Sequence, residues 1–183
     1  MAGIVVYNMG KKQTEPGSFE HVYDTTYPLL YRIALRITGD ENISEDLCQE
    51  AFIRYYKRII PFPDLDQAKY WLIRVVKNLA FNREKRRGRE QKANYRYSKE
   101  LTSFTRSGEA QLLRNESARI VQEALKRLPF NLRTAIVLRE YGDLSYRDIA
   151  RVLGISEANV KVRVFRAREQ LKKHLDEEEV DVS

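Results

Sequence analysis

Two stretches of the chain combine basic side chains with aromatic or amide side chains, a composition suited to binding nucleic acid. One lies between residues 70 and 92 and the other between residues 157 and 173. Lys and Arg can neutralise phosphates and read guanine, Asn can read adenine, and aromatic rings can stack on exposed bases. The sequence has no clustered acidic metal site and no nucleophile with a paired base, which disfavours a nuclease or another DNA enzyme.

The charge balance indicates a polyanionic partner. The 183 residues include 33 Lys and Arg and 26 Asp and Glu, a formal charge of +7. Five of the acids lie in the tail at 176–183, so the rest of the chain carries 33 basic and 21 acidic residues, a charge of +12. A positive charge of this size attracts nucleic acid or an anionic membrane surface.

Composition excludes several other classes of protein. No apolar stretch approaches the roughly 18–20 residues that span a bilayer, and residues 1–10 lack the basic start and cleavage site of a secretion signal. The single cysteine, Cys48, excludes an internal disulfide and a cysteine-clustered zinc site, and His21 and His174 are far apart. We expect a soluble cytoplasmic protein with no metal or other cofactor and no small-molecule substrate.

Apolar residues recur at helical spacing almost throughout, so the predicted fold class is all-α. A first helix is expected at 19–38, where Pro28 should kink or divide it, and a second at about 46–57 after cap residues at 40–44. A third should run from Gln67, capped by Asp66, to about Arg87.

The Pro-rich segment at 61–66 predicts a stiff loop, and the Ser-, Thr- and Lys-rich stretch near 94–115 predicts a flexible linker. Two small helical domains should lie on either side of that linker. The predicted organisation is an N-terminal extension (1–17), a first domain (18–92), a linker (93–115), a second domain (116–175) and an acidic tail (176–183).

Residues 142–171 have the pattern of a helix-turn-helix. Ser145 and Asp148 form a capping box that opens a short helix, with Ile149, Ala150 and Leu153 as its buried stripe. Gly154 supplies the turn, and Ser156 caps a second helix. The buried seam of that second helix should consist of Val160, Val164, Ala167 and Leu171.

The opposite side of the second helix suits the major groove of duplex DNA. The alternative is a solvated amphipathic helix in a bundle that does not bind DNA. Capping, glycine position and charge all favour the DNA-binding interpretation. The candidate readers on this face are Asn159, Lys161, Val162, Arg163, Phe165 and Arg166.

The third predicted helix also interleaves aromatic and basic side chains, the combination that holds separated strands. A charge run at 82–92 could instead be a solvated face, and Trp71 could simply belong to the core. The candidate residues for this second nucleic-acid surface are Phe62, Tyr70, Trp71, Arg74, Lys77, Asn78, Arg83, Arg86 and Arg87.

The motifs together resemble the extracytoplasmic-function (group 4) sigma factors of bacterial RNA polymerase, in the sigma-70 superfamily. The resemblance rests on DLCQEAFIRYYK (46–57), KYWLIRVVKNLAFNREKRR (69–87) and the long segment 128–169, which includes the helix-turn-helix. The order and spacing of these three motifs in a short chain make the resemblance specific.

The resemblance implies an alternative sigma factor that is not an enzyme. Its first domain would be the region-two module, which binds core polymerase and opens the minus-ten promoter element. Its second domain would be the region-four module, which reads the minus-thirty-five element. The implied partners are promoter DNA, core RNA polymerase through its largest-subunit coiled coil and its flap, and an anti-sigma factor, and the implied location is the nucleoid.

The resemblance also implies residue roles. Asp46, Gln49, Glu50 and Arg54 match the helix that docks the coiled coil, a polar stripe that spacing alone leaves open between solvent surface and docking face. Phe62 matches the segment that captures a base flipped from the non-template strand, and Asn78 lines that pocket. Lys161, Val162, Arg163, Phe165 and Arg166 match the minus-thirty-five readers. The proline-flanked loop departs from the family pattern, so a minus-ten preference does not transfer.

Three alternatives stay open at the level of the sequence. The chain could be a helix-turn-helix transcriptional regulator with an N-terminal sensing domain. Cys48, where the family usually has an aliphatic residue, could be a redox sensor, although a buried structural role is favoured because no neighbour in sequence lowers its pKa. The acidic tail could fold onto the basic C-terminal face, although a solvated tail is favoured.

Overall fold

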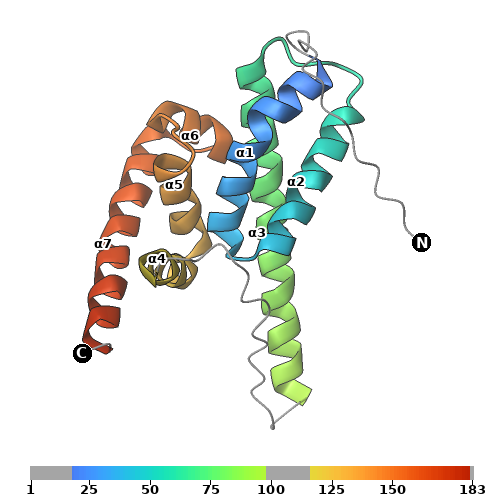
Figure 1. Cartoon of the computed structure of the whole chain (residues 1–183). Coiled ribbons are helices and arrows are strands. Elements are labelled where there is room, and N and C mark those ends of the chain that lie inside the picture. The colour runs from blue at the N-terminus through green and yellow to red at the C-terminus, as the bar shows by residue number, and fades with distance from the viewer. Residues whose placement is uncertain (1–17, 98–115, 182–183) are drawn as a thin grey trace.

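The computed structural model describes residues 18–97 and 116–181, and these residues form an all-helical fold (Figure 1). The fold class predicted from the sequence is therefore confirmed. The N-terminal extension at 1–17, most of the predicted linker, and residues 182–183 lie outside the described residues. The helices are α1 (Phe19–Thr38), α2 (Glu41–Tyr56), α3 (Leu65–Tyr97), α4 (Glu116–Arg127), α5 (Phe130–Glu140), α6 (Tyr146–Leu153) and α7 (Glu157–Asp181).

The first bundle consists of α1, α2 and α3, which pack against one another. Leu30, Ile33 and Ile37 of α1 are fully buried in its core. Pro28 was expected to kink or divide α1, and it does not divide the helix, which is continuous through it. Proline removes a single backbone donor, and the apolar contacts on both sides of Pro28 hold the two halves in register.

The start of α3 differs from the prediction. The capping residue is Asp64, whose carboxylate accepts a hydrogen bond of 2.8 Å from the backbone N–H of Gln67. Asp66, the predicted cap, lies inside the first turn, where its carboxylate pairs with Lys69 at 2.6 Å. Both aspartates suit a helix N-terminus, and the conformation of the preceding loop determines which of them caps α3.

The end of α3 also differs from the prediction. The helix was expected to end near Arg87, yet it runs for 33 residues to Tyr97, past the predicted start of the linker at residue 93. Strong helix formers predominate at 89–93, and Arg86 and Glu90 form an i,i+4 ion pair of 2.8 Å. The C-terminal part of α3 projects beyond the other helices (Figure 1).

The second bundle consists of α4 to α7, and it packs directly on the first. α4 and α5 contact α1, and α6 contacts α3. The apolar core continues from one bundle into the other. The sequence did not predict this contact. Phe62 is only half-buried and Lys161 is exposed, so the two predicted nucleic-acid surfaces are not sealed inside the shared core.

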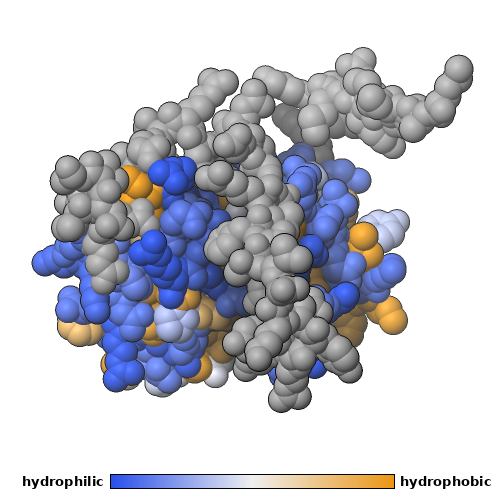
Figure 2. Space-filling view, turned by 90° about the horizontal axis from the view of Figure 1, so that it is seen from below, coloured by the Kyte–Doolittle hydropathy of each residue, from blue (hydrophilic) through white to orange (hydrophobic). Residues whose placement is uncertain are grey.

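The surface seen from below, where grey atoms do not cover it, is largely hydrophilic (Figure 2). Apolar side chains appear there as small separate groups, as on most proteins. Some large apolar side chains are nevertheless exposed within the described residues. Ile59 and Ile60 in the loop before α3, and Val162 and Phe165 on α7, are examples.

Cys48 is fully buried between α1 and α2, and burial raises the pKa of its thiol to about 12. The structure therefore supports the structural role of Cys48. The nearby Glu45 raises the pKa of Cys48 further. Because the thiolate is the reactive form, a raised pKa makes this thiol unreactive.

We predict that the free energy of unfolding falls as the pH rises above 9, by up to about 1.4 kcal/mol per pH unit from Cys48 alone. The folded thiol stays protonated up to about pH 12, whereas the unfolded thiol ionises near 9.0. Urea unfolding at pH 8 and pH 10 measures the effect. Tyr23 and Tyr27, whose pKa values burial also raises, act in the same direction. Cys48→Ala should therefore weaken the pH dependence without abolishing it, and an unchanged dependence would contradict the prediction.

Candidate nucleic-acid interface

The helix-turn-helix forms from α6 and α7 with the capping predicted from the sequence. The hydroxyl of Ser145 accepts a hydrogen bond of 3.1 Å from the backbone N–H of Asp148, and Ser156 caps α7 by accepting one of 3.2 Å from the N–H of Asn159. Gly154 has φ of 69°, a left-handed conformation that glycine adopts without strain, and it ends α6. These local interactions fix the angle at which α7 leaves the turn.

The buried stripe of α6 is only partly as predicted. Ile149 is fully buried, whereas Ala150 and Leu153 are half-buried, and Val152 takes the second fully buried place. Ile149 and Val152 are three residues apart, so they share a face of this short helix. The predicted seam of α7 is confirmed more closely, because Val160, Val164 and Ala167 are fully buried and Leu171 is half-buried.

The predicted minus-thirty-five readers lie on the first half of α7, on the side opposite its buried seam. Val162 is 45% exposed and Phe165 is 64% exposed, although both are apolar. Asn159, Lys161 and Arg166 are exposed as well, whereas Arg163 is half-buried and lies near Lys77 of the first bundle. An exposed surface with cations, an amide and two apolar side chains can contact phosphates, base edges and thymine methyl groups.

The loop between α2 and α3 holds a stack of aromatic rings capped by an arginine. The Phe62 and Tyr55 rings are nearly parallel, with centroids 6.0 Å apart, and the Phe62 and Trp71 centroids are 5.6 Å apart. The guanidinium of Arg58 lies 4.2 Å from the Phe62 centroid and 5.1 Å from the Trp71 centroid. Sequence reasoning found Phe62 and Trp71 but missed Tyr55 and Arg58, whose contact depends on the loop conformation.

Phe62 also lines a cavity of about 270 Å³. Drug-sized ligands occupy pockets of about 300–1,000 Å³, so a cavity of this size suits a ligand as small as one nucleobase. The lining is mostly apolar and aromatic, with one cation. The lining residues are Phe19, Tyr55, Tyr56, Arg58, Ile59, Ile60, Pro61 and Phe62.

The other predicted minus-ten residues are spread along α3, in two different environments. Tyr70 and Lys77 are half-buried beside the second bundle, whereas Arg74 is exposed, although its guanidinium donates a hydrogen bond of 2.5 Å to the carbonyl oxygen of Arg151 in α6. Burial lowers the pKa of Lys77, and the neighbouring Arg74 and Arg163 lower it further. The remaining members of the set are exposed: Asn78, Arg83, Arg86 and Arg87.

The polar stripe of α2 lies on the surface of the first bundle. Asp46, Gln49 and Arg54 are exposed, and Glu50 is half-buried and pairs with Arg54 at 2.8 Å. Asp46 lies 3.9 Å from Arg83 of α3. The stripe therefore presents charges of both signs, which suits a protein partner better than it suits DNA.

Two absences apply only to 18–97 and 116–181. These residues contain no group of three His, Cys, Asp or Glu side chains placed to hold a metal ion. They also contain no helix with the length and apolar character needed to cross a bilayer.

Comparison with known proteins decides the family. The family model for sigma-70 region 2 matches residues 22–90, and the model for sigma-70 region 4 matches residues 118–171. The chain belongs to the sigma-70 family. Sigma factors direct promoter-specific transcription initiation by RNA polymerase, and this one has the two regions that match its two helical bundles.

Curated relatives place the sigma factor in the extracytoplasmic-function group. It is 36% identical over 152 residues to the RNA polymerase sigma-H factor of Pseudomonas aeruginosa, covering 78% of each chain. It is 30% identical over 176 residues to the extracytoplasmic-function sigma factor SigW of Bacillus subtilis, covering 90% of this chain and 92% of SigW.

Solved structures support the same fold. The sigma factor RpoE of Bartonella quintana, in complex with the anti-sigma factor NepR, gives a TM-score of 0.63 at 24% identity over 86% of this chain and 96% of RpoE. CnrH, in complex with the cytosolic domain of CnrY, gives a TM-score of 0.61 at 24% identity over 86% of this chain and 87% of CnrH.

The region-two match also decides between two interpretations of the first bundle. Residues 22–90 form a sigma region-two module and not a sensing domain, so the transcriptional-regulator alternative is not favoured.

We predict that Arg58→Ala will expose Trp71 to water, because the guanidinium covers its ring. Trp71 is the only tryptophan in the chain, so its fluorescence reports on the stack directly. The emission should shift to longer wavelength, and the free energy of unfolding should fall by about 1 kcal/mol. Lys57→Ala removes an equal charge one residue earlier and should leave the emission unchanged. Identical spectra for the two variants would contradict the stacked arrangement.

Proposed function

We propose that the two bundles divide promoter recognition between them. The second bundle (116–175) reads the minus-thirty-five element in duplex DNA, and the first (18–92) binds core polymerase and opens the minus-ten element. The single observation that carries the proposal is that one chain has both an exposed face on α7 and a stack of aromatic rings at the loop before α3. One surface suits intact duplex and the other suits an unpaired base.

In the minus-thirty-five complex, the first half of α7 lies in the major groove. Lys161, Arg163 and Arg166 supply cations for phosphates or guanine, and Asn159 supplies an amide for adenine. Val162 and Phe165 gain most from contact with thymine methyl groups, because both are exposed although apolar. Counterion release from these contacts makes binding strongly dependent on salt.

In the minus-ten complex, a base from the non-template strand enters the cavity beside Phe62. Unstacking a base costs a few kcal/mol, and stacking on an aromatic side chain returns about 1–3 kcal/mol per base. Tyr70, Trp71, Arg74, Lys77 and Asn78 extend the surface along α3, and Arg83, Arg86 and Arg87 hold the backbone farther along. No covalent step is needed, so the sigma factor acts without being an enzyme.

Core RNA polymerase holds both bundles at one promoter and raises their effective concentration there. The stripe of Asp46, Gln49, Glu50 and Arg54 docks the coiled coil of the largest subunit, and the second bundle docks the flap. This assignment places the protein in the cytoplasm, associated with the nucleoid. The chain between α3 and α4 spans the distance between the two elements.

An anti-sigma factor is proposed as a further partner. One similar structure, RpoE, is a complex with the anti-sigma factor NepR, and another, CnrH, is a complex with the cytosolic domain of CnrY. An inhibitor of this kind would prevent polymerase docking or promoter contact until a signal releases it.

Run-off transcription with core polymerase on a library of genomic fragments tests the proposal and yields both promoter elements. We expect transcripts only when the sigma factor is present. Phe62→Ala should reduce transcription from duplex promoters about tenfold or more, because base capture no longer offsets the cost of melting. A template with a premelted minus-ten region serves as the control and should restore most of the activity. Equal losses on both templates would contradict a role for Phe62 in melting.

Arg166→Ala tests the duplex-reading surface on a promoter found in this way. Removing one base contact should reduce discrimination against a substituted minus-thirty-five element by about 5- to 160-fold, equal to about 1–3 kcal/mol. Arg168→Ala is the matched control, since it removes the same charge from α7 but pairs with Glu140 at 2.7 Å within the second bundle. Unchanged discrimination in Arg166→Ala would refute the assignment of this face.

A further inference from the structure

We infer that Arg58 is a specificity-determining residue of the minus-ten surface: its guanidinium reads the edge of the base that enters the cavity beside Phe62. The chemistry of a guanidinium selects guanine or cytosine at that position over adenine or thymine. This inference rests on the proposed function and deepens it, since it names the base that the cavity takes. The sequence motifs assign no role to Arg58.

Three contacts hold Arg58 beside the cavity. Its backbone N–H donates a hydrogen bond of 3.1 Å to the carbonyl oxygen of Tyr55. Its side-chain Nε donates one of 3.3 Å to the carbonyl oxygen of Ile60, and its guanidinium lies 4.2 Å from the centroid of Phe62. Pro61 further limits the conformations of this loop. Arg58 therefore lies at the cavity before any ligand enters it.

Most of the hydrogen-bond donors of Arg58 are left over for a ligand. A guanidinium carries five N–H donors. Within the part of the chain that the structure describes, only the donor at Nε has an acceptor in the protein. The side chain is exposed, and no described carboxylate forms an ion pair with it. Arg54, one turn earlier, instead pairs with Glu50 at 2.8 Å.

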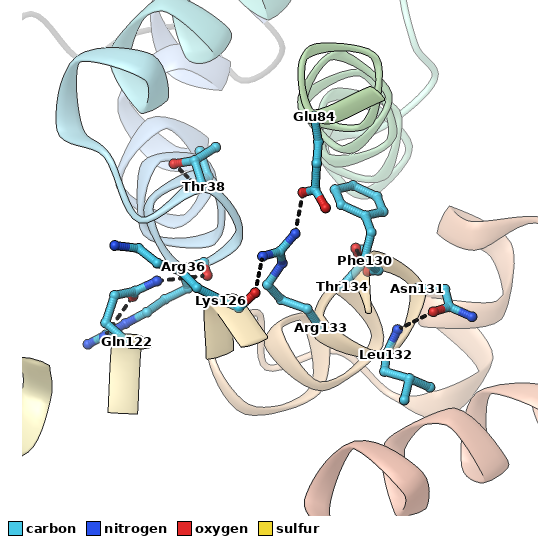
Figure 3. A network of polar contacts seen from close by, with 11 residues as sticks. Arg36, Thr38, Glu84, Gln122, Lys126, Phe130, Asn131, Leu132, Arg133 and Thr134 are labelled. Carbon is cyan, nitrogen blue, oxygen red and sulfur yellow. Dashed lines mark hydrogen bonds and ion pairs between the residues drawn. The ribbon is translucent and has the colours of Figure 1, made fainter. Parts of the chain in front are cut away.

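Arginines at the contact between the two bundles use their donors within the protein (Figure 3). The guanidinium of Arg133 on α5 points toward α3, where it pairs with the carboxylate of Glu84. Arg36 of α1 donates a hydrogen bond of 3.2 Å to the side chain of Gln122 on α4. These two arginines stabilise the fold. Arg58, which lines the cavity, is instead placed to bind a ligand.

The rest of the cavity lining offers stacking and no charge. Apart from Arg58, the described residues that line the cavity are aromatic or apolar, and none of them is acidic. A lining of this kind binds any base by its faces, because every base has a π-face. Discrimination between bases therefore depends on the polar groups that meet the base edge, and among these lining residues Arg58 brings the only charged one.

Two adjacent acceptors on one edge of a base match a guanidinium best, because arginine presents parallel N–H donors and no acceptor. A base that has left the stack exposes both its Watson–Crick and its Hoogsteen edge. Guanine then offers O6 beside N7, and cytosine offers O2 beside N3. Adenine instead places its N6 amino group between N1 and N7, and thymine places N3–H between O2 and O4. Guanine and cytosine therefore share the chemistry that Arg58 recognises.

Capture of a base moves the guanidinium from the ring face to the base edge. Without DNA the guanidinium covers Phe62 and Trp71, at 4.2 and 5.1 Å from their centroids. A base that stacks on Phe62 displaces it, and the side chain of Arg58 still starts from the same loop, within reach of the base. The alternative is contact with the phosphate of the captured nucleotide, which would strengthen binding of all four bases equally.

Binding of single strands to the complete holoenzyme tests the inference. The probes are fluorescent single strands that carry the non-template minus-ten sequence of a promoter found by run-off transcription, and fluorescence anisotropy measures their affinity. An abasic site is placed at each position in turn. The captured position is the one where the abasic site weakens binding to the wild type but not to Phe62→Ala. All four bases are then compared at that position.

The tightest binding in the wild type should be to guanine or cytosine, about 5- to 160-fold tighter than to adenine or thymine. Arg58→Lys keeps the charge but loses the planar fork of donors, so it should bind the four bases with nearly equal affinity. Arg89→Lys is the matched control. It makes the same substitution at an exposed arginine of α3 that does not line the cavity, and it should keep the base preference.

Base analogues test the contact at the level of single atoms. The analogues 7-deazaguanine and 3-deazacytosine each lack one acceptor of the adjacent pair and keep the ring that stacks. Replacing the preferred base by its analogue should weaken binding to the wild type by about fivefold or more. The same replacement should leave binding to Arg58→Lys unchanged.

A wild-type preference for adenine or thymine, or a base preference that survives in Arg58→Lys, would overturn the inference. An equal loss of affinity for all four bases in Arg58→Lys would also overturn it, because it would indicate a phosphate contact or a loosened ring stack. Failure of the proposed function would look different. No position would then respond to an abasic site in the wild type and stop responding in Phe62→Ala.

Discussion

The buried guanidinium of Arg133 is the constraint on which the arrangement of the two bundles depends. Arg133 is only 5% exposed, and burial lowers its pKa, whereas the nearby carboxylate of Glu84 raises it. A buried cation without a partner is costly, and Arg133 obtains its counter-charge from the other bundle. Within its own bundle it donates only one hydrogen bond among the described contacts, of 3.2 Å to the carbonyl oxygen of Lys126. The ion pair therefore makes the second bundle depend on α3.

Opposing electrostatics act a few turns away along the same helix. Arg74, Lys77 and Arg163 bring three cations to the contact between α3 and the helix-turn-helix, where burial lowers the pKa of Lys77 and the two arginines lower it further. Glu84 is about half exposed, so solvent weakens its attraction for Arg133 compared with a fully buried pair. The contact between the two bundles therefore combines attraction between Arg133 and Glu84 with repulsion among the cations near Lys77, and its net strength is modest.

Local features could be predicted from the sequence because short-range interactions determine them. Ser145, Gly154 and Ser156 act as the capping and turn chemistry requires, and the α7 seam follows helical periodicity. The choice between Asp64 and Asp66 could not be predicted, because the loop path selects the cap. Glu84 looked like one more member of a charge run, and Arg133 lay in an apolar helix with no sign of its partner 49 residues away. The contact between bundles is long-range and leaves no periodic signal.

The residues of the candidate site could likewise be predicted only in part from the sequence. Phe62 and Trp71 were identified by residue type, whereas Arg58 and Tyr55 joined them only once the loop had folded. A ring stack capped by a guanidinium is stable without DNA, because cation–π and stacking contacts satisfy the exposed faces. A base that enters must replace some of those contacts with its own. Under the proposed function, the energy of base capture would be a difference between two stacks, and bases that stack better than the arginine they displace would be favoured.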